Sequence, residues 1–347
     1  MQRIVICLLT LLPLPLWAES WPLETHEVPF DYDSPAHPLD YAPLDRAASR
    51  WTICVSYPHL KDAYWLSVNY GMVEEAERLE VGFRLVEAGG YPNLERQTEQ
   101  IEACVAQGAD ALIVGTVSFD GLTPTVQALS ERVPVIAAVN DIADPGIAAK
   151  AAVSWYDMGA TTGRFIADRH PKGSAPVQLA WFPGPEGAGW VSFIEAGFRD
   201  AIAQSSASIA LTKYGDTGRE IQVTLVEEAL DSGIEFDYLV GSAPTAEVAV
   251  SILRARGLED RISIVSDYMS HAVFRGIRRG RILAAPTDFP IMQGKLAIEM
   301  AVRAIEGTLE VRHAGPKIQL VTSDMAGNTD LAETLAPASF IPVFELE

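Results

Sequence analysis

From residue 51 onward, short apolar segments alternate with longer amphipathic ones, and this alternation constrains the fold more than any other feature of the chain. Units of a strand followed by a helix, stacked into a parallel sheet, produce this pattern, because each strand is buried on both faces and each helix on one. The expected strands are 52–57, 82–87, 111–115, 133–138, 176–182, 208–213, 236–241, 261–266 and 282–285. The expected helices are 65–79, 94–107, 155–169, 190–203, 219–231, 245–255, 271–279 and 292–306.

So many strands approach the practical limit of one open sheet, and a chain of 347 residues exceeds what one hydrophobic core usually organises. We therefore predict an α/β fold with two doubly wound parallel-sheet lobes joined by a hinge. The first lobe is expected to comprise 51–141 plus 269–308, and the second 142–268 plus 309–347. Ligands of open parallel sheets bind at the carboxyl ends of the strands, so the cleft between the lobes is the expected site.

Two N-terminal segments precede this pattern. Residues 1–18 have a basic start and an apolar run, which predicts a secretory signal peptide cleaved after Ala18 and therefore a periplasmic location. A membrane anchor is the weaker alternative, because the run is shorter than the roughly 18–20 apolar residues that span a bilayer. Residues 19–50 are rich in proline and are expected to form an extended arm.

The net charge limits the possible partners, and the cysteine content allows one disulfide. The chain has 26 basic against 46 acidic residues, a net charge of −20, which argues against binding nucleic acid or an anionic membrane surface. Cys7 lies in the signal segment, so Cys54 and Cys104 remain for a disulfide in an oxidising compartment. Spacing alone leaves open whether they are bridged or are two separate buried thiols.

Motifs of catalysis are missing from the sequence. It contains no G-x-S-x-G, no G-x-x-x-x-G-K-[ST] and no H-E-x-x-H. The segment 184–189 has the spacing G-x-x-G-x-G, which differs from the dinucleotide fingerprint and indicates a strand-to-helix turn at the cleft. The six histidines lack metal-ligand spacing, and His59 is expected in a solvated loop or at a helix start rather than as a ligand. We expect no enzyme activity, no cofactor and no metal.

Large aromatic residues recur where strands end and helices begin. Trp65 opens the first helix, Tyr91 follows the second strand, Trp155 opens the helix after the lobe crossing, and Tyr268 follows a later strand. Rings gathered at one cleft form a cage that attracts methylated ammonium groups, at about 0.5–2 kcal/mol per desolvated ring. Asp62 adds a carboxylate nearby. Stacking on a sugar is the competing interpretation, although sugar sites need many fixed polar partners.

The two-lobe plan resembles the type I periplasmic binding proteins of the ribose-binding and LacI-like group over nearly the whole mature chain. Within that group, the sequence is similar to the branch that detects trimethylamine N-oxide and works with a membrane sensor histidine kinase. The segments that carry the similarity are 57–58, 60–62, 64–67, 69–72, 86–91, 139–140, 155 with 158–159, 183–185, 195–199 and 268–271.

The resemblance implies a function, a site and partners. It implies a non-catalytic protein that binds trimethylamine N-oxide and signals through the periplasmic domain of a sensor histidine kinase. The implied ligand contacts are Asp62, Tyr64, Trp65, Tyr91, Trp155 and Tyr268. The resemblance also favours a disulfide between Cys54 and Cys104.

Some positions depart from related proteins or leave alternatives. Asn140-Asp141 stands where sugar-binding relatives tend to carry Asp-Arg, which disfavours a sugar. Trp190 is a departure within the matched branch, and we expect it to pack on the rim of the cleft rather than to narrow it. Asp288 is expected near the hinge. The alternative function is the substrate-binding component of an ABC importer for a small quaternary amine or a sugar.

Overall fold

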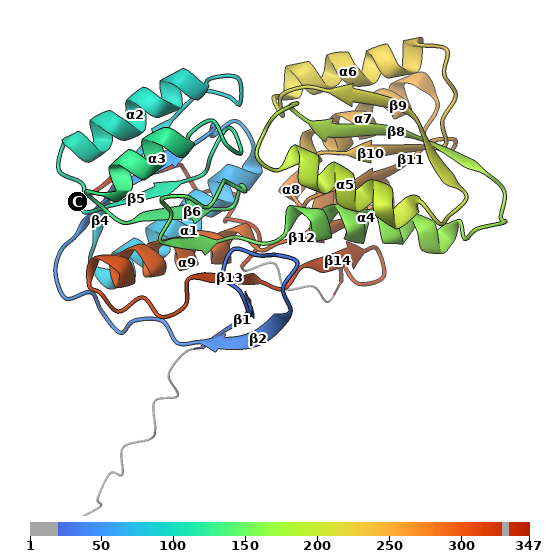
Figure 1. Ribbon diagram of the computed structural model, residues 1–347. Helices are drawn as coiled ribbons and strands as arrows, with labels where there is room; N and C mark the ends of the chain where they lie inside the picture. Colours follow the sequence, from blue (N-terminus) through green and yellow to red (C-terminus); the bar gives the residue numbers. More distant parts are fainter. Residues whose placement is uncertain (1–19, 328–332) are drawn as a thin grey trace, which may run out of the picture.

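The computed structural model describes residues 20–327 and 333–347 and has two α/β lobes side by side (Figure 1). The expected signal peptide, 1–18, lies outside the described residues. No helix in the described ranges is long and apolar enough to cross a membrane.

The first lobe is built on a nine-stranded sheet with the order β15-β4-β3-β5-β6-β7-β13-β1-β2. Its parallel centre consists of β3 (Thr52–Tyr57), β4 (Gly82–Glu87), β5 (Ala111–Val114), β6 (Val135–Ala138), β7 (Ala149–Ala151) and β13 (His313–Pro316). Every residue of β5 and β6 is buried, as expected for strands covered on both faces. The helices of this lobe are α1 (Ala63–Leu79), α2 (Leu94–Ala106), α3 (Thr123–Ser130) and α9 (Pro290–Ile305).

The second lobe has a four-stranded parallel sheet with the order β11-β10-β8-β9. Its strands are β8 (Val177–Gly184), β9 (Ala207–Tyr214), β10 (Tyr238–Gly241) and β11 (Ser263–Ser266). Its helices are α4 (Trp155–Arg169), α5 (Val191–Ile202), α6 (Arg219–Asp231), α7 (Ala243–Arg256) and α8 (His271–Arg278). Together, the two sheets confirm the predicted α/β class with two parallel-sheet lobes.

The lobe boundaries differ from those expected. The segment from 309 onward, expected in the second lobe, supplies β13 and β15 (Glu345–Leu346) to the first sheet. The strand expected at 282–285 is β12 (Ala284–Thr287), which pairs with β14 (Gln319–Thr322) in a separate antiparallel ribbon between the lobes (Figure 1). Strand composition alone does not encode which partner strand a segment joins.

The N-terminal segment, expected to be an extended arm, is folded onto the first lobe. It forms a hairpin of β1 (Trp21–His26) and β2 (Ala36–Tyr41), and β1 pairs with β13. Its prolines are tolerated for local reasons. Pro22 precedes the first residue paired with β13, and Pro38 lies on β2, an edge strand with one unpaired side.

Glycines allow helices α4 and α5 to cross at close range. A methyl group added at Gly197 would overlap the carbonyl oxygen of Tyr156, and one added at Gly159 would overlap that of Ile194. Backbone atoms cannot yield as a flexible side chain can, so the helices would have to separate.

Gly197→Ala is therefore expected to destabilise the protein by about 1–3 kcal/mol, the usual cost of overpacking a core. Urea-induced unfolding measures this difference. Gly218→Ala is the matched control, because the space beside Gly218 is open and its nearest neighbour lies at 3.9 Å. Equal stability of the two variants would contradict the close helix crossing.

Candidate functional site

The first lobe presents three of its aromatic side chains at the carboxyl ends of its strands. Asp62 caps helix α1 by accepting a hydrogen bond from the backbone N–H of Trp65 at 3.1 Å. This cap fixes Tyr64 and Trp65 in the first turn, at the edge where β3 ends. Trp65 packs against Gly115, where any side chain would collide with the indole. Tyr91 comes from the loop after β4.

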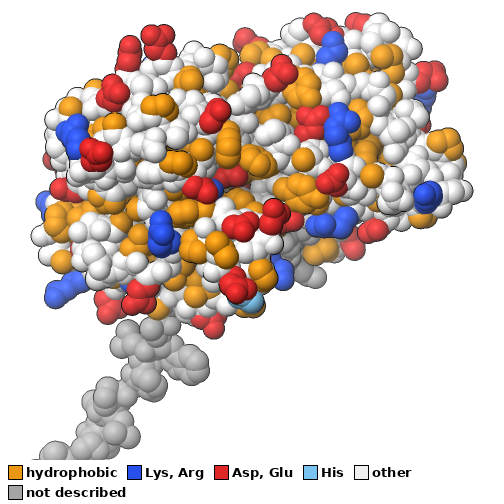
Figure 2. All heavy atoms as spheres, viewed as in Figure 1, with side chains coloured by type: hydrophobic (Ala, Val, Ile, Leu, Met, Phe, Trp, Pro, Cys, Tyr) orange, Lys and Arg blue, Asp and Glu red, His pale blue; other side chains and the backbone are white. Residues whose placement is uncertain are grey.

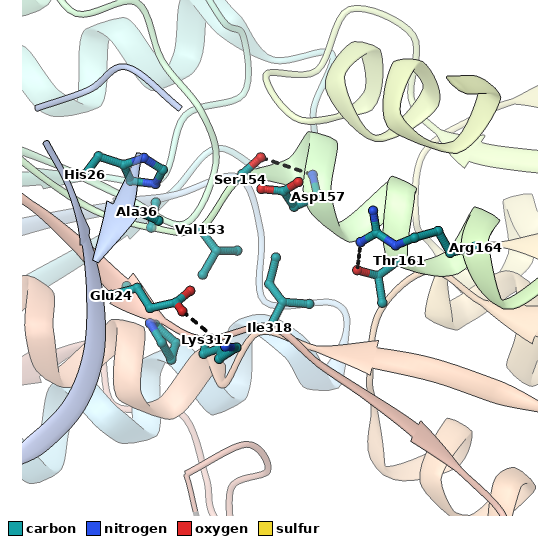
Figure 3. A pocket seen from close by; sticks show the side chains of 13 residues that line it. Glu24, His26, Ala36, Val153, Ser154, Asp157, Thr161, Arg164, Lys317 and Ile318 are labelled. Atoms are coloured by element: carbon teal, nitrogen blue, oxygen red, sulfur yellow. Dashed lines mark hydrogen bonds and ion pairs between the residues drawn. The ribbon is translucent and has the colours of Figure 1, made fainter. Parts of the chain in front are cut away.

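The second lobe contributes Trp155 and Tyr268. Ser154 caps helix α4 by accepting from the backbone N–H of Asp157 at 3.0 Å, as Figure 3 shows. The indole N–H of Trp155 donates to the carbonyl oxygen of Val139 at 2.9 Å, which ties this ring to the lobe crossing. Tyr268 lies between β11 and α8.

The structure brings all six predicted site residues to one cavity. The ring centroid of Tyr64 lies 5.4 Å from that of Tyr268 and 6.4 Å from that of Trp155. Centroid separations of this size are typical of interacting aromatic pairs. The cavity is lined by Asp62, Tyr64, Trp65, Tyr91, Asn140, Trp155, Trp190, Thr217 and Tyr268. Both lobes therefore form its wall.

Trp190 lies in this wall and not on the rim, contrary to expectation. Its side chain is only 2% exposed, and its ring centroid is 5.1 Å from that of Trp155. The position depends on the glycine-rich turn before it, because a side chain at Gly184 would collide with the Trp190 ring. Gly184 also has a φ of +118°, which favours glycine. The turn thus directs the indole inward.

Asn140 and Thr217 are further lining residues that sequence reasoning did not select, and His59 contacts Thr217 from outside the lining. Asn140 donates to the Tyr91 hydroxyl at 3.2 Å and to the Thr116 carbonyl oxygen at 2.7 Å. His59 is fully buried and not solvated, because its Nε2 pairs with the Thr217 hydroxyl at 3.0 Å. All three follow strand ends, which is the signal that could have found them.

The cavity is acidic and aromatic. The structure describes all of its lining residues, and none of them is Lys or Arg. Burial raises the pKa of Asp62 above its ordinary value. Asp288, expected near the hinge, lies behind Tyr64 and accepts a hydrogen bond from its hydroxyl at 2.5 Å, and burial raises the pKa of Asp288 as well. Such a site suits a ligand with methyl groups rather than a carboxylate or phosphate.

The cavity volume is about 10 Å³, which corresponds to about one water molecule. Contacts between the lobes hold it at this size. They include the His59–Thr217 hydrogen bond, a 3.7 Å ion pair between Lys61 and Asp216, and a 5.3 Å ring contact between Phe119 and Phe193. A larger ligand must therefore shift the lobes or their side chains, which links occupancy to conformation.

A roomier cavity of about 200 Å³ lies where the N-terminal hairpin meets the start of α4 (Figure 3). Its walls mix polar and apolar side chains, and Glu24 and Lys317 face each other across 3.5 Å as an ion pair. It lacks the gathered rings of the aromatic cavity. The smaller, aromatic cavity is therefore the candidate ligand site.

Asp267, beside Tyr268, is fully buried, and neither of its carboxylate oxygens has a hydrogen-bond partner among the described residues. Burial raises its pKa well above the ordinary value, so the folded protein holds this proton at a pH where the unfolded chain has lost it. The stability linked to this group is complete below the unfolded pKa of about 3.9. This stability is lost progressively as the pH rises from the unfolded pKa toward the pKa of Asp267 in the folded protein.

Asp267→Asn keeps the shape of the protonated carboxyl and does not titrate. The variant is expected to be more stable than the natural protein at pH 7, by about 1.4 kcal/mol per unit of pKa elevation, with the difference vanishing near pH 4. Urea unfolding across this range measures it. A variant less stable at pH 7 would indicate that the carboxylate is stabilised by a partner.

Cys54 on β3 and Cys104 on α2 are joined by a disulfide, with their Cα atoms 6.0 Å apart. This pairing agrees with the one that the resemblance favours. No group of three or more His, Cys, Asp or Glu side chains within the described ranges is placed to hold a metal ion. Acidic side chains are spread over both lobes on the face in Figure 2, with basic ones scattered among them.

Comparison with known proteins places the chain in a family. Residues 50–341 match the periplasmic binding proteins and sugar-binding domain of the LacI family. The chain belongs to this family. It is a periplasmic ligand-binding protein, and the family is non-enzymatic.

Similar proteins cover almost the whole chain. The periplasmic protein TorT of Escherichia coli (strain K12) is 36% identical over 347 residues, covering 99% of this chain and 97% of TorT. A crystal structure of the TorS sensor domain–TorT complex in the presence of TMAO (trimethylamine N-oxide) matches with a TM-score of 0.77 and 38% identity, over 85% of this chain and 99% of that one. An ABC transporter solute-binding protein from Bradyrhizobium sp. BTAi1 with bound bis-tris has a TM-score of 0.79 and 45% identity, over 96% and 99% of the two chains.

Proposed function

We propose that this protein detects trimethylamine N-oxide in the aromatic cavity and signals its occupancy through a TorS-type sensor histidine kinase. The observation that carries the proposal is one cavity, lined by aromatic rings from both lobes and by no basic side chain. Similarity to TorT, and to its complex with the TorS sensor domain, supports the choice of ligand and partner.

Each part of the ligand has a chemical counterpart in the cavity. The methyl groups carry the spread positive charge of the nitrogen and pack against the electron-rich faces of Tyr64, Trp65 and Trp155. The oxygen is negatively polarised and needs hydrogen-bond donors. The Asp62 carboxyl, with a pKa raised by burial, is such a donor when protonated.

Signalling follows from the way the cavity is divided between the lobes. Asp62, Tyr64, Trp65 and Tyr91 belong to the first lobe, whereas Trp190, Thr217 and Tyr268 belong to the second. A ligand held between them favours the lobe arrangement in which all its contacts form. A kinase domain that binds this arrangement more tightly reads the occupancy, because ligand and partner stabilise the same state.

The alternative function is the receptor of an ABC importer, the class of the similar Bradyrhizobium solute-binding protein, but the similarity to TorT over almost the whole chain favours the sensor. That protein was crystallised with bis-tris, an amine with hydroxyl groups. Both functions use a two-lobed receptor, so the partner distinguishes them.

The test is analytical ultracentrifugation of the mature protein mixed with the periplasmic sensor domain of the TorS-type kinase from the same organism. The sensor hypothesis predicts a complex whose stability changes when trimethylamine N-oxide is added. The importer alternative predicts ligand binding with no complex at micromolar concentrations. Ribose in place of the N-oxide controls for nonspecific effects of a small solute.

A further inference from the structure

Most hydrogen-bond donors in the cavity wall already have acceptors within the protein. The Tyr64 hydroxyl donates to Asp288, and the Trp155 indole N–H donates to the Val139 carbonyl oxygen. The Asn140 amide reaches the Tyr91 hydroxyl and the Thr116 carbonyl oxygen. These groups are committed to holding the cavity in shape.

The indole N–H of Trp190 is different. It is buried, and its nitrogen has no hydrogen-bond partner among the described residues. A buried N–H without an acceptor is unfavourable, and native proteins rarely retain one without a reason. Trp181 has a second buried indole N–H without an acceptor, but its ring stacks on Phe198 at 4.2 Å in the core of the second lobe and does not line the cavity.

Trp190 lies between Tyr91 and Tyr268 in the cavity wall. Its ring centroid is 6.3 Å from that of Tyr91 and 6.1 Å from that of Tyr268. Burial raises the pKa of Tyr91, so its hydroxyl stays protonated at neutral pH. Because the Tyr91 hydroxyl oxygen accepts a hydrogen bond from Asn140, the Tyr91 O–H remains available to donate to a ligand.

We propose that Trp190 determines specificity by donating its indole N–H to the oxygen of the ligand, so that the cavity selects an N-oxide over a quaternary ammonium. This inference rests on the proposed function. Trp190 precedes helix α5 of the second lobe, and Tyr91 belongs to the first. An oxygen between the two groups joins the lobes through hydrogen bonds as well as through ring contacts.

Tetramethylammonium is the discriminating probe, because it replaces the oxygen of trimethylamine N-oxide by a fourth methyl group of similar size. The aromatic faces serve both compounds. Only the N-oxide gives the Trp190 N–H an acceptor. Removal of the donor is therefore expected to change the ratio of the two affinities, whereas a loss of packing is expected to lower both affinities by a similar factor.

The experiment compares calorimetric titrations of Trp190→Phe and the natural protein with both compounds. Phenylalanine keeps an aromatic face and removes the donor. We expect the dissociation constant for trimethylamine N-oxide to rise about tenfold and that for tetramethylammonium to change less than about twofold. Trp181→Phe, which removes a buried donor outside the cavity, is expected to change neither.

An equal loss for both compounds would overturn the inference, because Trp190 would then act through packing alone. If the natural protein binds neither compound, the proposed function itself fails. A measurement on the natural protein tests the inference even if the Trp190→Phe variant does not fold. The Trp190 indole N–H resonance is expected to move downfield in the presence of trimethylamine N-oxide but not of tetramethylammonium, and an unmoved resonance would also overturn the inference.

Discussion

Trp155→Ala is expected to raise the dissociation constant for trimethylamine N-oxide about thirtyfold, corresponding to about 2 kcal/mol for a fully desolvated ring. The Trp155 ring contacts Tyr64, Trp190 and Tyr268, which makes it central to the cavity wall. Its removal deprives the methyl groups of one electron-rich face and leaves the neighbouring rings less firmly placed. Calorimetric titration measures the change.

Trp155→Phe is the matched variant, because it keeps an aromatic face and gives up the hydrogen bond to Val139. It is expected to lose much less affinity than the alanine variant. Thermal unfolding establishes that both variants are folded under the conditions of the titration. An alanine variant that binds as tightly as the natural protein would exclude this cavity as the ligand site.

Removal of the Cys54–Cys104 disulfide is expected to destabilise the protein by about 4 kcal/mol, the chain-entropy value for a loop of this length. The two cysteines are 50 residues apart and buried between β3 and α2. The double variant Cys54→Ala/Cys104→Ala breaks the bridge without placing a polar group in the core. Urea unfolding of the variant under oxidising conditions measures the loss.

The natural protein unfolded in the presence of a reductant provides the control for the cysteine variant. The reduced natural protein is expected to be about as stable as the double variant. The two should differ only by the free energy of unfolding that the variant loses with its two buried sulfur atoms. A natural protein whose stability does not respond to reductant would contradict a stabilising bridge. Ligand affinity is expected to be unchanged, because neither cysteine lines the cavity.

The parallel sheets and their helices could be predicted because each element has its own local signal. Helix α4 begins and ends at the expected residues, and β3 does as well. The three-residue β7 and the short β13 carry too little periodicity to be recognised. The N-terminal hairpin was missed because its prolines argue against strands, although its edge position and register accommodate them. Such pairings depend on contacts distant in sequence.

The part of the site formed by side chains that follow parallel strands could be predicted, because the sheet topology determines where those side chains lie. Side chains following parallel strands meet at one edge, so aromatic residues at those positions converge. The inward position of Trp190 could not be predicted in the same way, because it depends on the φ of Gly184 and on the path of the turn that follows. The shielding of His59 likewise depends on Thr217, 158 residues later, from the opposite lobe.

Calorimetric titration of the purified mature protein with trimethylamine N-oxide, beside ribose and glycine betaine, tests the central claim most directly. An aromatic cavity without basic side chains predicts saturable, one-to-one binding of the N-oxide and no measurable binding of ribose. Glycine betaine is expected to bind more weakly than the N-oxide, because its carboxylate would enter an acidic cavity of small volume. Saturable binding of ribose or betaine without binding of the N-oxide would contradict the account.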